Sequence, residues 1–226
     1  IVASLVGSEM CIRDSYYGMI SLIDHNVGRI MSQLKEKGLL DETIVIYTSD
    51  HGDHLGERGL YLKGPMLYES LINVGMIVRG PGIKAGASET APITTLDIAA
   101  TLCDYAETSL PDEAQSISLK GCFGGDASPH KAVFSEWDVS ASRCGVQLDL
   151  RTVHRGDAKL TVELQSGDGE LYDLSVDKHE MKNLWNMTEA AELQAQMTEL
   201  LWTRPGAELT EFDLSLIHIS EPTRLA

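Results

Sequence analysis

Several features that mark other classes of protein are missing from this sequence of 226 residues. It has no run of about eighteen apolar residues, so it predicts no membrane-spanning helix. It has 18 Lys and Arg against 34 Asp and Glu, and the net charge of -16 excludes the basic surface of a nucleic-acid-binding protein. No basic and then apolar leader opens the sequence, so none is predicted, and periplasmic, secreted and cytoplasmic locations all stay open.

Cysteine is also scarce and irregularly spaced. The four cysteines at positions 11, 103, 122 and 144 form no C-x-x-C pair, which excludes a zinc framework or a dense disulfide scaffold. With 43% hydrophobic and 23% charged residues, the composition is that of an ordinary globular protein. The length suits one domain with a small addition, and nothing in the sequence indicates an oligomeric state.

The two ends of the sequence resemble translated adapter DNA. Residues 5–15 read L-V-G-S-E-M-C-I-R-D-S, and residues 214–224 read L-S-L-I-H-I-S-E-P-T-R. Both are similar to translations of one transposase adapter used to prepare DNA libraries, read from opposite strands. We therefore predict that residues 1–15 and 214–226 are non-native, and that Cys11 and His218 carry no function.

The first half of the remaining sequence predicts an α/β arrangement. Apolar residues recur at threes and fours over residues 16–37, which indicates an amphipathic helix that ends at Gly38. Residues 43–49 (T-I-V-I-Y-T-S) form a β-branched apolar run, typical of a strand buried on both faces. A shorter strand is expected at 76–78. A helix from Thr94 or Thr95 to Tyr105 follows, with an apolar face of Leu96, Ile98, Ala99 and Leu102.

The second half of the sequence predicts short strands in place of the α/β arrangement. Ser, Gly and Asp are frequent over 112–130, and short strands are then expected at 132–136, 146–153, 159–164 and 170–174. A helix is expected at 188–202. We predict part of an α/β domain at 16–111 and an antiparallel-sheet subdomain at 112–213, closed by a terminal helix.

The chemistry is expected in the loop that follows the first strand. Residues 50–65 contain two Asp, two His, a Glu, an Arg and a Lys among four glycines. Asp50 and His51 stand where a strand ends, the edge at which open α/β sheets bind ligands, and they can ligate a divalent metal. Lys63, twelve residues on, suits a sulfate or phosphate oxygen. A solvated loop whose charges pair with one another is an equal alternative on spacing alone.

The longer stretch around this loop resembles the sulfatase family of the alkaline-phosphatase superfamily, including its arylsulfatase and choline-sulfatase branches. The likeness runs through S-D-H-G-D-H-L-G-E-R-G at 49–59, the lysine at 63, Tyr68-Glu69 and V-R-G-P-G at 78–82. It continues with T-L-D-I-A-A-T-L at 95–102 and E-L-Y-D-L at 170–174. It covers about residues 16–203, so the resemblance implies the C-terminal part of such an enzyme.

The resemblance implies roles for particular residues. Asp50 and His51 would ligate the active-site metal, calcium in most sulfatases and manganese as the alternative, and Lys63 would contact the sulfate as a catalytic and substrate-binding residue. His54 and Arg58 are expected to be solvated loop residues, with substrate contact as the second interpretation. The implied substrate is a small-molecule or carbohydrate sulfate ester.

The sequence departs from the family pattern in three places. Asn73-Val-Gly75 replaces R-V-P, and Asp177-Lys178 replaces D-P. The C-x-P-S-R or S-x-P-S-R motif that supplies the formylglycine nucleophile is not present. The sequence therefore predicts that this chain alone is inactive. The alternatives are a phosphonate monoester or phosphodiester hydrolase of the same superfamily and a non-catalytic binding domain of the same fold.

Overall fold

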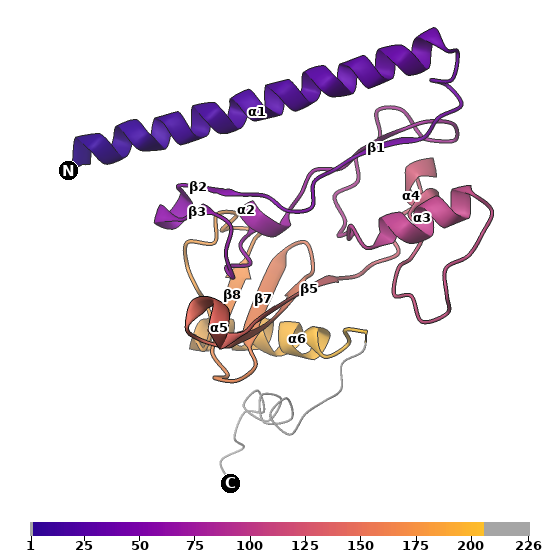
Figure 1. The fold of residues 1–226 in the computed structure, drawn as a ribbon. Helices are drawn as coiled ribbons and strands as arrows, with labels where there is room; N and C mark the ends of the chain where they lie inside the picture. The colour runs from indigo at the N-terminus through magenta and orange to yellow at the C-terminus, as the bar shows by residue number, and fades with distance from the viewer. Residues whose placement is uncertain (1, 206–226) are drawn as a thin grey trace. The chain divides into compact units, whose positions relative to one another are not determined.

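A computed structural model describes residues 2–205 of the chain (Figure 1). These residues form two compact units. The first consists of the residues up to Gly64 together with Ser70–Ala85, and the second of Pro65–Glu69 together with the residues from Gly86 on. The predicted domain boundary at 111 stays a prediction. The adapter-like stretch at 214–226 lies outside the described residues.

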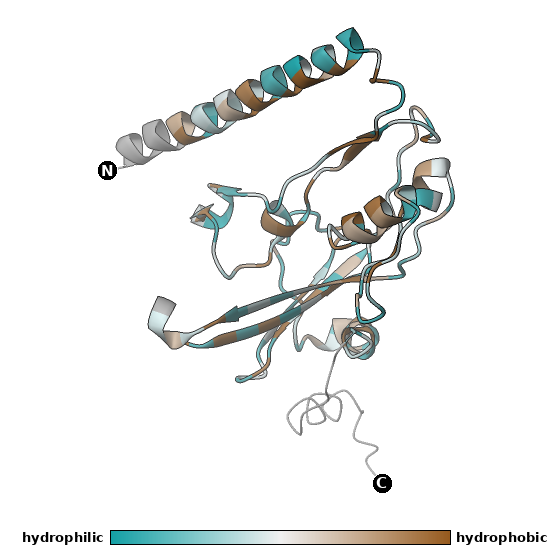
Figure 2. Cartoon of the chain, turned by 45° about the vertical axis from the view of Figure 1, so that its right-hand side comes forward, coloured by the Kyte–Doolittle hydropathy of each residue, from teal (hydrophilic) through white to brown (hydrophobic). Residues whose placement is uncertain are grey.

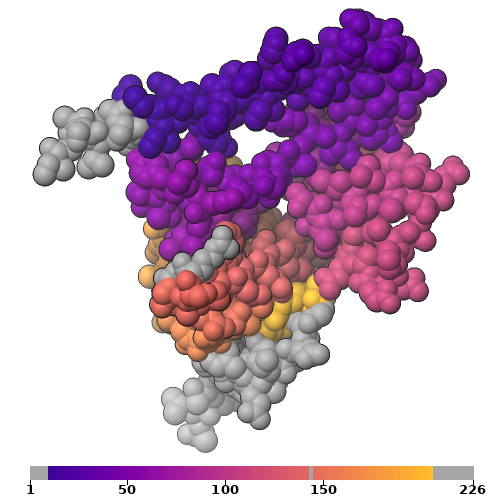
Figure 3. Space-filling model, in the orientation of Figure 1, coloured from indigo at the N-terminus to yellow at the C-terminus, as the bar shows by residue number. Residues whose placement is uncertain are grey.

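The first unit begins with one long helix, α1 (Val2–Glu36). The predicted stop is confirmed: Gly38 has a φ of +70°, a left-handed conformation that favours glycine. Figure 2 shows apolar residues recurring along this helix, and Figure 3 shows the surface of α1 from residue 10 on. Its apolar residues stay exposed, with 42% exposure at Ile20 and 61% at Ile30. No described helix, α1 included, is both long and apolar enough to cross a membrane.

The predicted buried strand is present, but its surroundings differ from the prediction. It is short, β1 (Val45–Tyr47), and it pairs with β4 (Ile77–Arg79) in an antiparallel two-stranded sheet. Its side chains are half-buried or exposed, so burial on both faces is wrong for the described residues. The reason is that β4 is the one strand paired with β1 there, and a two-stranded sheet cannot bury both of its faces.

The second unit contains the predicted antiparallel sheet. Its order is β5 (Val133–Val139), β6 (Leu148–His154), β7 (Ala158–Glu163) and β8 (Gly169–Asp173). The expected terminal helix is also present, as a 3-10 turn η2 (Thr188–Ala190) followed by α6 (Ala191–Leu201). The hydrophobic core of this unit joins α6 to β6, β7 and β8 (Figure 1).

The two faces of this sheet differ in character. Side chains alternate across a strand, so Leu160 and Val162 share one face of β7 while Lys159 and Thr161 share the other. The first face is apolar and packs in the core with Met197 and Leu201 of α6. The second face is polar, and it contacts residues 67–69.

Helix α3 (Asp97–Tyr105) forms where expected, but the opposite face is buried. Leu96 and Leu102 are about half exposed, whereas Asp97 and Thr101 are fully buried. The cause is hydrogen bonding: the Asp97 carboxylate accepts from the Ile117 backbone N–H (2.9 Å), and the Thr101 hydroxyl accepts from that of Leu119 (2.8 Å). Two short helices were not predicted, α4 (Lys120–Gly124) and α5 (Ala141–Cys144).

Candidate active-site loop

The loop after β1 starts with a tight turn that fixes Asp50 and His51. The Ser49 hydroxyl donates to the backbone carbonyl of His51 (2.7 Å), and the His51 backbone N–H donates to Oδ1 of Asp50 (2.9 Å). That backbone hydrogen bond lowers the pKa of the exposed Asp50 carboxyl. The carboxylate is therefore kept in the form that binds cations.

The hydrogen bonds of His51 assign its tautomer. Nδ1 lies 2.8 Å from the carbonyl oxygen of Gly52, and because a carbonyl can only accept, Nδ1 carries the proton. Nε2 therefore keeps a lone pair, which accepts a hydrogen bond from Nζ of Lys63 at 3.1 Å. Oδ2 of Asp50 lies 3.6 Å from the same nitrogen. A backbone carbonyl that orients an imidazole in this way is the usual support of a metal-binding histidine.

A small hairpin brings Lys63 back to His51. Strands β2 (His54–Leu55) and β3 (Tyr61–Leu62) pair, with His54 opposite Leu62, and the 3-10 turn η1 (Glu57–Gly59) joins them. Arg58 and Leu62 both have a positive φ, +54° and +64°, which is strained for residues other than glycine. Backbone strain of this kind concentrates at functional sites, and here it lies beside Lys63.

The base of the loop is closed by contacts to α2 (Glu69–Ile72). The Gly52 N–H donates to the carbonyl of Leu71 (2.7 Å), and Nδ1 of His54 lies 2.8 Å from the Ser70 hydroxyl. A Cβ at position 52 would lie 2.1 Å from the Ser70 carbonyl oxygen, so this approach requires glycine.

The structure corrects the expectation for His54. Its side chain is only 2% exposed, so it is not a solvated loop residue. Solvent exposure was expected because residues 50–65 contain many charged side chains. The pairing of β2 with β3 and the hydrogen bond to the Ser70 hydroxyl instead bury the His54 ring. Arg58 is half-buried. Substrate contact stays a prediction for both, and the burial of His54 argues against it.

Asp50 and His51 fit part of a divalent-metal site. They offer a charged carboxylate and an imidazole lone pair directed to one side of the turn. Across the described residues, no group of three or more His, Cys, Asp or Glu side chains is placed to hold one ion. Calcium takes about six to eight oxygen ligands, so this pair fits as two ligands of a larger set.

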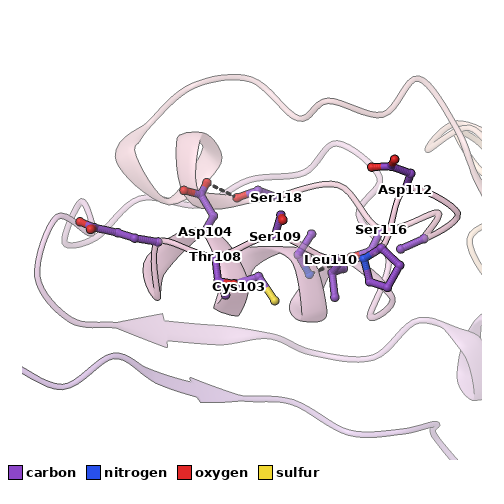
Figure 4. Close-up of a pocket in the computed structure, with 12 residues that line it drawn as sticks. Cys103, Asp104, Thr108, Ser109, Leu110, Asp112, Ser116 and Ser118 are labelled. Atoms are coloured by element: carbon purple, nitrogen blue, oxygen red, sulfur yellow. Dashed lines mark hydrogen bonds between the residues drawn. The ribbon is translucent and has the colours of Figure 1, made fainter.

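A separate hollow of about 390 Å³ lies beside α3 and contains none of the predicted site residues. Its lining is mostly polar, and Figure 4 shows Asp104 and Ser118, which are joined by a 2.7 Å hydrogen bond. A second feature that the sequence did not indicate is the pair of His130 and the buried Asp97, 2.6 Å apart. His130 lies in the loop before β5, and through Asp97 it ties this loop to α3.

The fold is that of hydrolases resembling alkaline phosphatase. A solved structure described as being in complex with its substrate D-glucosamine-2-N,6-O-disulfate matches with a TM-score of 0.75 and 30% identity, covering 81% of this chain and 38% of that one. The phosphonate monoester hydrolase of Agrobacterium radiobacter matches with a TM-score of 0.71 and 27% identity, covering 87% of this chain and 43% of that one.

Among hydrolases with this fold, sequence comparison identifies one family. The family model for sulfatases matches residues 8–108. The N-acetylglucosamine-6-O-sulfatase of Bacteroides thetaiotaomicron is 32% identical over 192 residues, which cover 82% of this chain and 34% of that protein. This chain belongs to the sulfatase family. It spans about a third of the length of the curated relatives it matches.

Proposed function

We propose that this chain supplies the metal- and anion-binding loop of a metal-dependent sulfuric ester hydrolase. The observation that carries the proposal is the meeting of Asp50, His51 and Lys63 at the end of β1. Lys63 is twelve residues from His51, yet its Nζ lies 3.1 Å from the lone pair of Nε2. A loop whose charges were only solvated would not need to orient that imidazole through the Gly52 carbonyl.

Each of the three residues has a distinct task in this proposal. Asp50 and His51 hold a divalent cation, calcium or alternatively manganese, which supplies positive charge next to the sulfate group. The exposed side chain of Lys63 is long enough to leave His51 and to donate hydrogen bonds to sulfate oxygens. There it stabilises the negative charge that develops as the ester bond breaks.

The substrate class we propose is a carbohydrate or small-molecule sulfate ester. Its support is the substrate chemistry of two similar proteins, an N-acetylglucosamine-6-O-sulfatase and a protein bound to a glucosamine disulfate. The formylglycine nucleophile of the family has no matching motif in this sequence. We therefore propose that the chain alone does not hydrolyse aryl sulfates, and measurable turnover of 4-nitrophenyl sulfate by the purified chain would refute this.

Anion binding at Lys63 tests the proposed function directly. In the presence of calcium, inorganic sulfate should protect Lys63 from acetylation by an amine-reactive reagent, measured by mass spectrometry of the peptides. The exposed Lys84 and Lys178 serve as internal controls and should react equally with and without sulfate. Equal reactivity of Lys63 with and without sulfate would contradict the proposal.

Phosphonate monoester hydrolysis is the second candidate, because a phosphonate monoester hydrolase shares the fold at 27% identity. The same acetylation assay separates the two when methylphosphonate replaces sulfate. Protection at lower concentration by sulfate than by methylphosphonate supports the sulfatase proposal. The reverse order supports the phosphonate hydrolase.

A further inference from the structure

The polar face of the C-terminal sheet binds three consecutive residues, Leu67, Tyr68 and Glu69, which follow Lys63 in the sequence. Nζ of Lys159 donates to the carbonyl oxygen of Leu67 at 2.7 Å. The hydroxyl of Tyr68 donates to Glu170 at 3.1 Å, and its ring packs edge-on against Tyr172. Oε1 of Glu69 lies 3.4 Å from Nζ of Lys159 and 3.3 Å from Nε2 of His154.

The centre of this contact is a buried charged cluster. Lys159 is 1% exposed and forms ion pairs with Glu69 and with Glu180, which is itself 3% exposed. Glu180 also accepts a hydrogen bond from the Glu69 backbone N–H at 2.9 Å. A buried charge is costly unless it is fully paired, and each partner of Lys159 lies far from it along the chain. Lys159 therefore holds the segment 67–69 at two points, the backbone carbonyl of Leu67 and the side chain of Glu69.

The segment continues directly into the residues that close the site loop. Glu69 is the first residue of α2, and the next two residues, Ser70 and Leu71, contact His54 and Gly52. Gly52 is in turn the residue whose carbonyl orients His51. Lys159 is thus connected to the site loop by a continuous path of covalent bonds and hydrogen bonds.

We propose that Lys159 is a positioning residue for the site loop. By holding the Leu67 carbonyl and Glu69, it fixes the start of α2, and α2 fixes the Gly52–Leu71 hydrogen bond beneath His51. We call the contacts of Lys159 with Leu67, Glu69 and Glu180 the clamp. The clamp does not depend on the proposed function, whereas its relevance to sulfate binding rests on that function.

The test is amide hydrogen exchange of the 226-residue chain, measured by NMR for the wild type and for Lys159→Met. We expect the Gly52 amide, which donates to Leu71, to exchange at least about tenfold faster in the variant. The matched control is Val162→Ala, a truncation of the same strand on its apolar face, which should leave the Gly52 amide unchanged. Glu180→Gln, which keeps the size of the side chain, replaces Lys159→Met if that variant does not fold.

Two outcomes overturn the proposal. One is an unchanged exchange rate of the Gly52 amide in Lys159→Met, even when the amides of residues 67–69 exchange faster. Lys159 would then stabilise only its own unit. The other is an equal increase of the Gly52 exchange rate in Val162→Ala, which would show a general loss of stability.

Sulfate protection of Lys63 in the same variants connects the clamp to function. If the clamp positions the loop, the sulfate concentration for half-protection rises several-fold in Lys159→Met and stays unchanged in Val162→Ala. Unchanged protection in Lys159→Met overturns the positioning role. A wild-type chain that shows no sulfate protection contradicts the proposed function, and the exchange of Gly52 still decides the clamp.

Discussion

The imidazole of His51 and the ammonium of Lys63 share one lone pair. Nε2 of His51 accepts from Nζ of Lys63 at 3.1 Å, while Nδ1 is occupied by the Gly52 carbonyl. A metal ion would need the same lone pair of Nε2. In the proposed function, a cation bound by His51 would therefore release Lys63 for an anion.

This relationship predicts how a Lys63→Met variant binds metal. Because Lys63 competes for the lone pair of Nε2, its removal should leave calcium or manganese affinity equal to or higher than that of the wild type. Sulfate binding should be lost in the same variant. Titration of the wild type and of Lys63→Met with manganese, followed by isothermal calorimetry, measures this, and weaker metal binding by Lys63→Met would contradict it.

The close approach of Gly52 to α2 predicts a steric effect. Gly52→Ala places a Cβ 2.1 Å from the Ser70 carbonyl oxygen, a backbone atom that cannot move away cheaply. We expect a loss of about 1–3 kcal/mol in the free energy of unfolding, measured by urea denaturation. The matched control is Gly64→Ala, where a Cβ meets nothing within 4 Å and stability should hardly change. Equal stability of the two variants would contradict this account of the loop base.

An arginine on the C-terminal sheet predicts a pH effect. Nη1 of Arg151 donates to Oδ1 of Asp138 at 2.6 Å, and this hydrogen bond lowers the pKa of the Asp138 carboxyl in the folded protein. The pair therefore stabilises the fold above the unfolded-state pKa of aspartate. That contribution is lost as the pH falls through the lowered folded-state value.

Arg151→Met should consequently be less stable than the wild type at neutral pH by about 1 kcal/mol, since Asp138 is largely exposed. The difference between the two proteins should shrink as the solution is acidified. Urea denaturation across the acidic range tests it, with Lys178→Met as an exposed control. A difference that stays constant or grows in acid would show that Arg151 acts by packing instead.

Local patterns in the sequence predicted most of the elements. The end of α1 just before Gly38 and the four strands of the C-terminal sheet follow from periodicity and turn residues over short distances. The site loop could also be placed, because a β-branched run followed by Asp50 and His51 is a local signal. In each case the information lies within about ten residues, the range over which these patterns act.

Features that depend on distant residues could not be predicted in this way. Lys159 looks like a surface residue in an alternating strand, and its burial follows from Leu67, which is 92 positions away, and from Glu180. The buried face of α3 is polar because Asp97 and Thr101 bond a later segment, whereas periodicity favoured the apolar side. The burial of His54 likewise depends on Ser70.

The most direct test of the central claim is paramagnetic broadening of the NMR signals of this chain by manganese. The ion is a stand-in for calcium and reports even a weakly held site. If Asp50 and His51 are the metal ligands, the amide signals of Asp50, His51 and Gly52 broaden at the lowest manganese concentration, and Asp50→Asn removes that selectivity. Broadening spread evenly over the exposed carboxylates of the chain, unchanged in Asp50→Asn, would contradict the account.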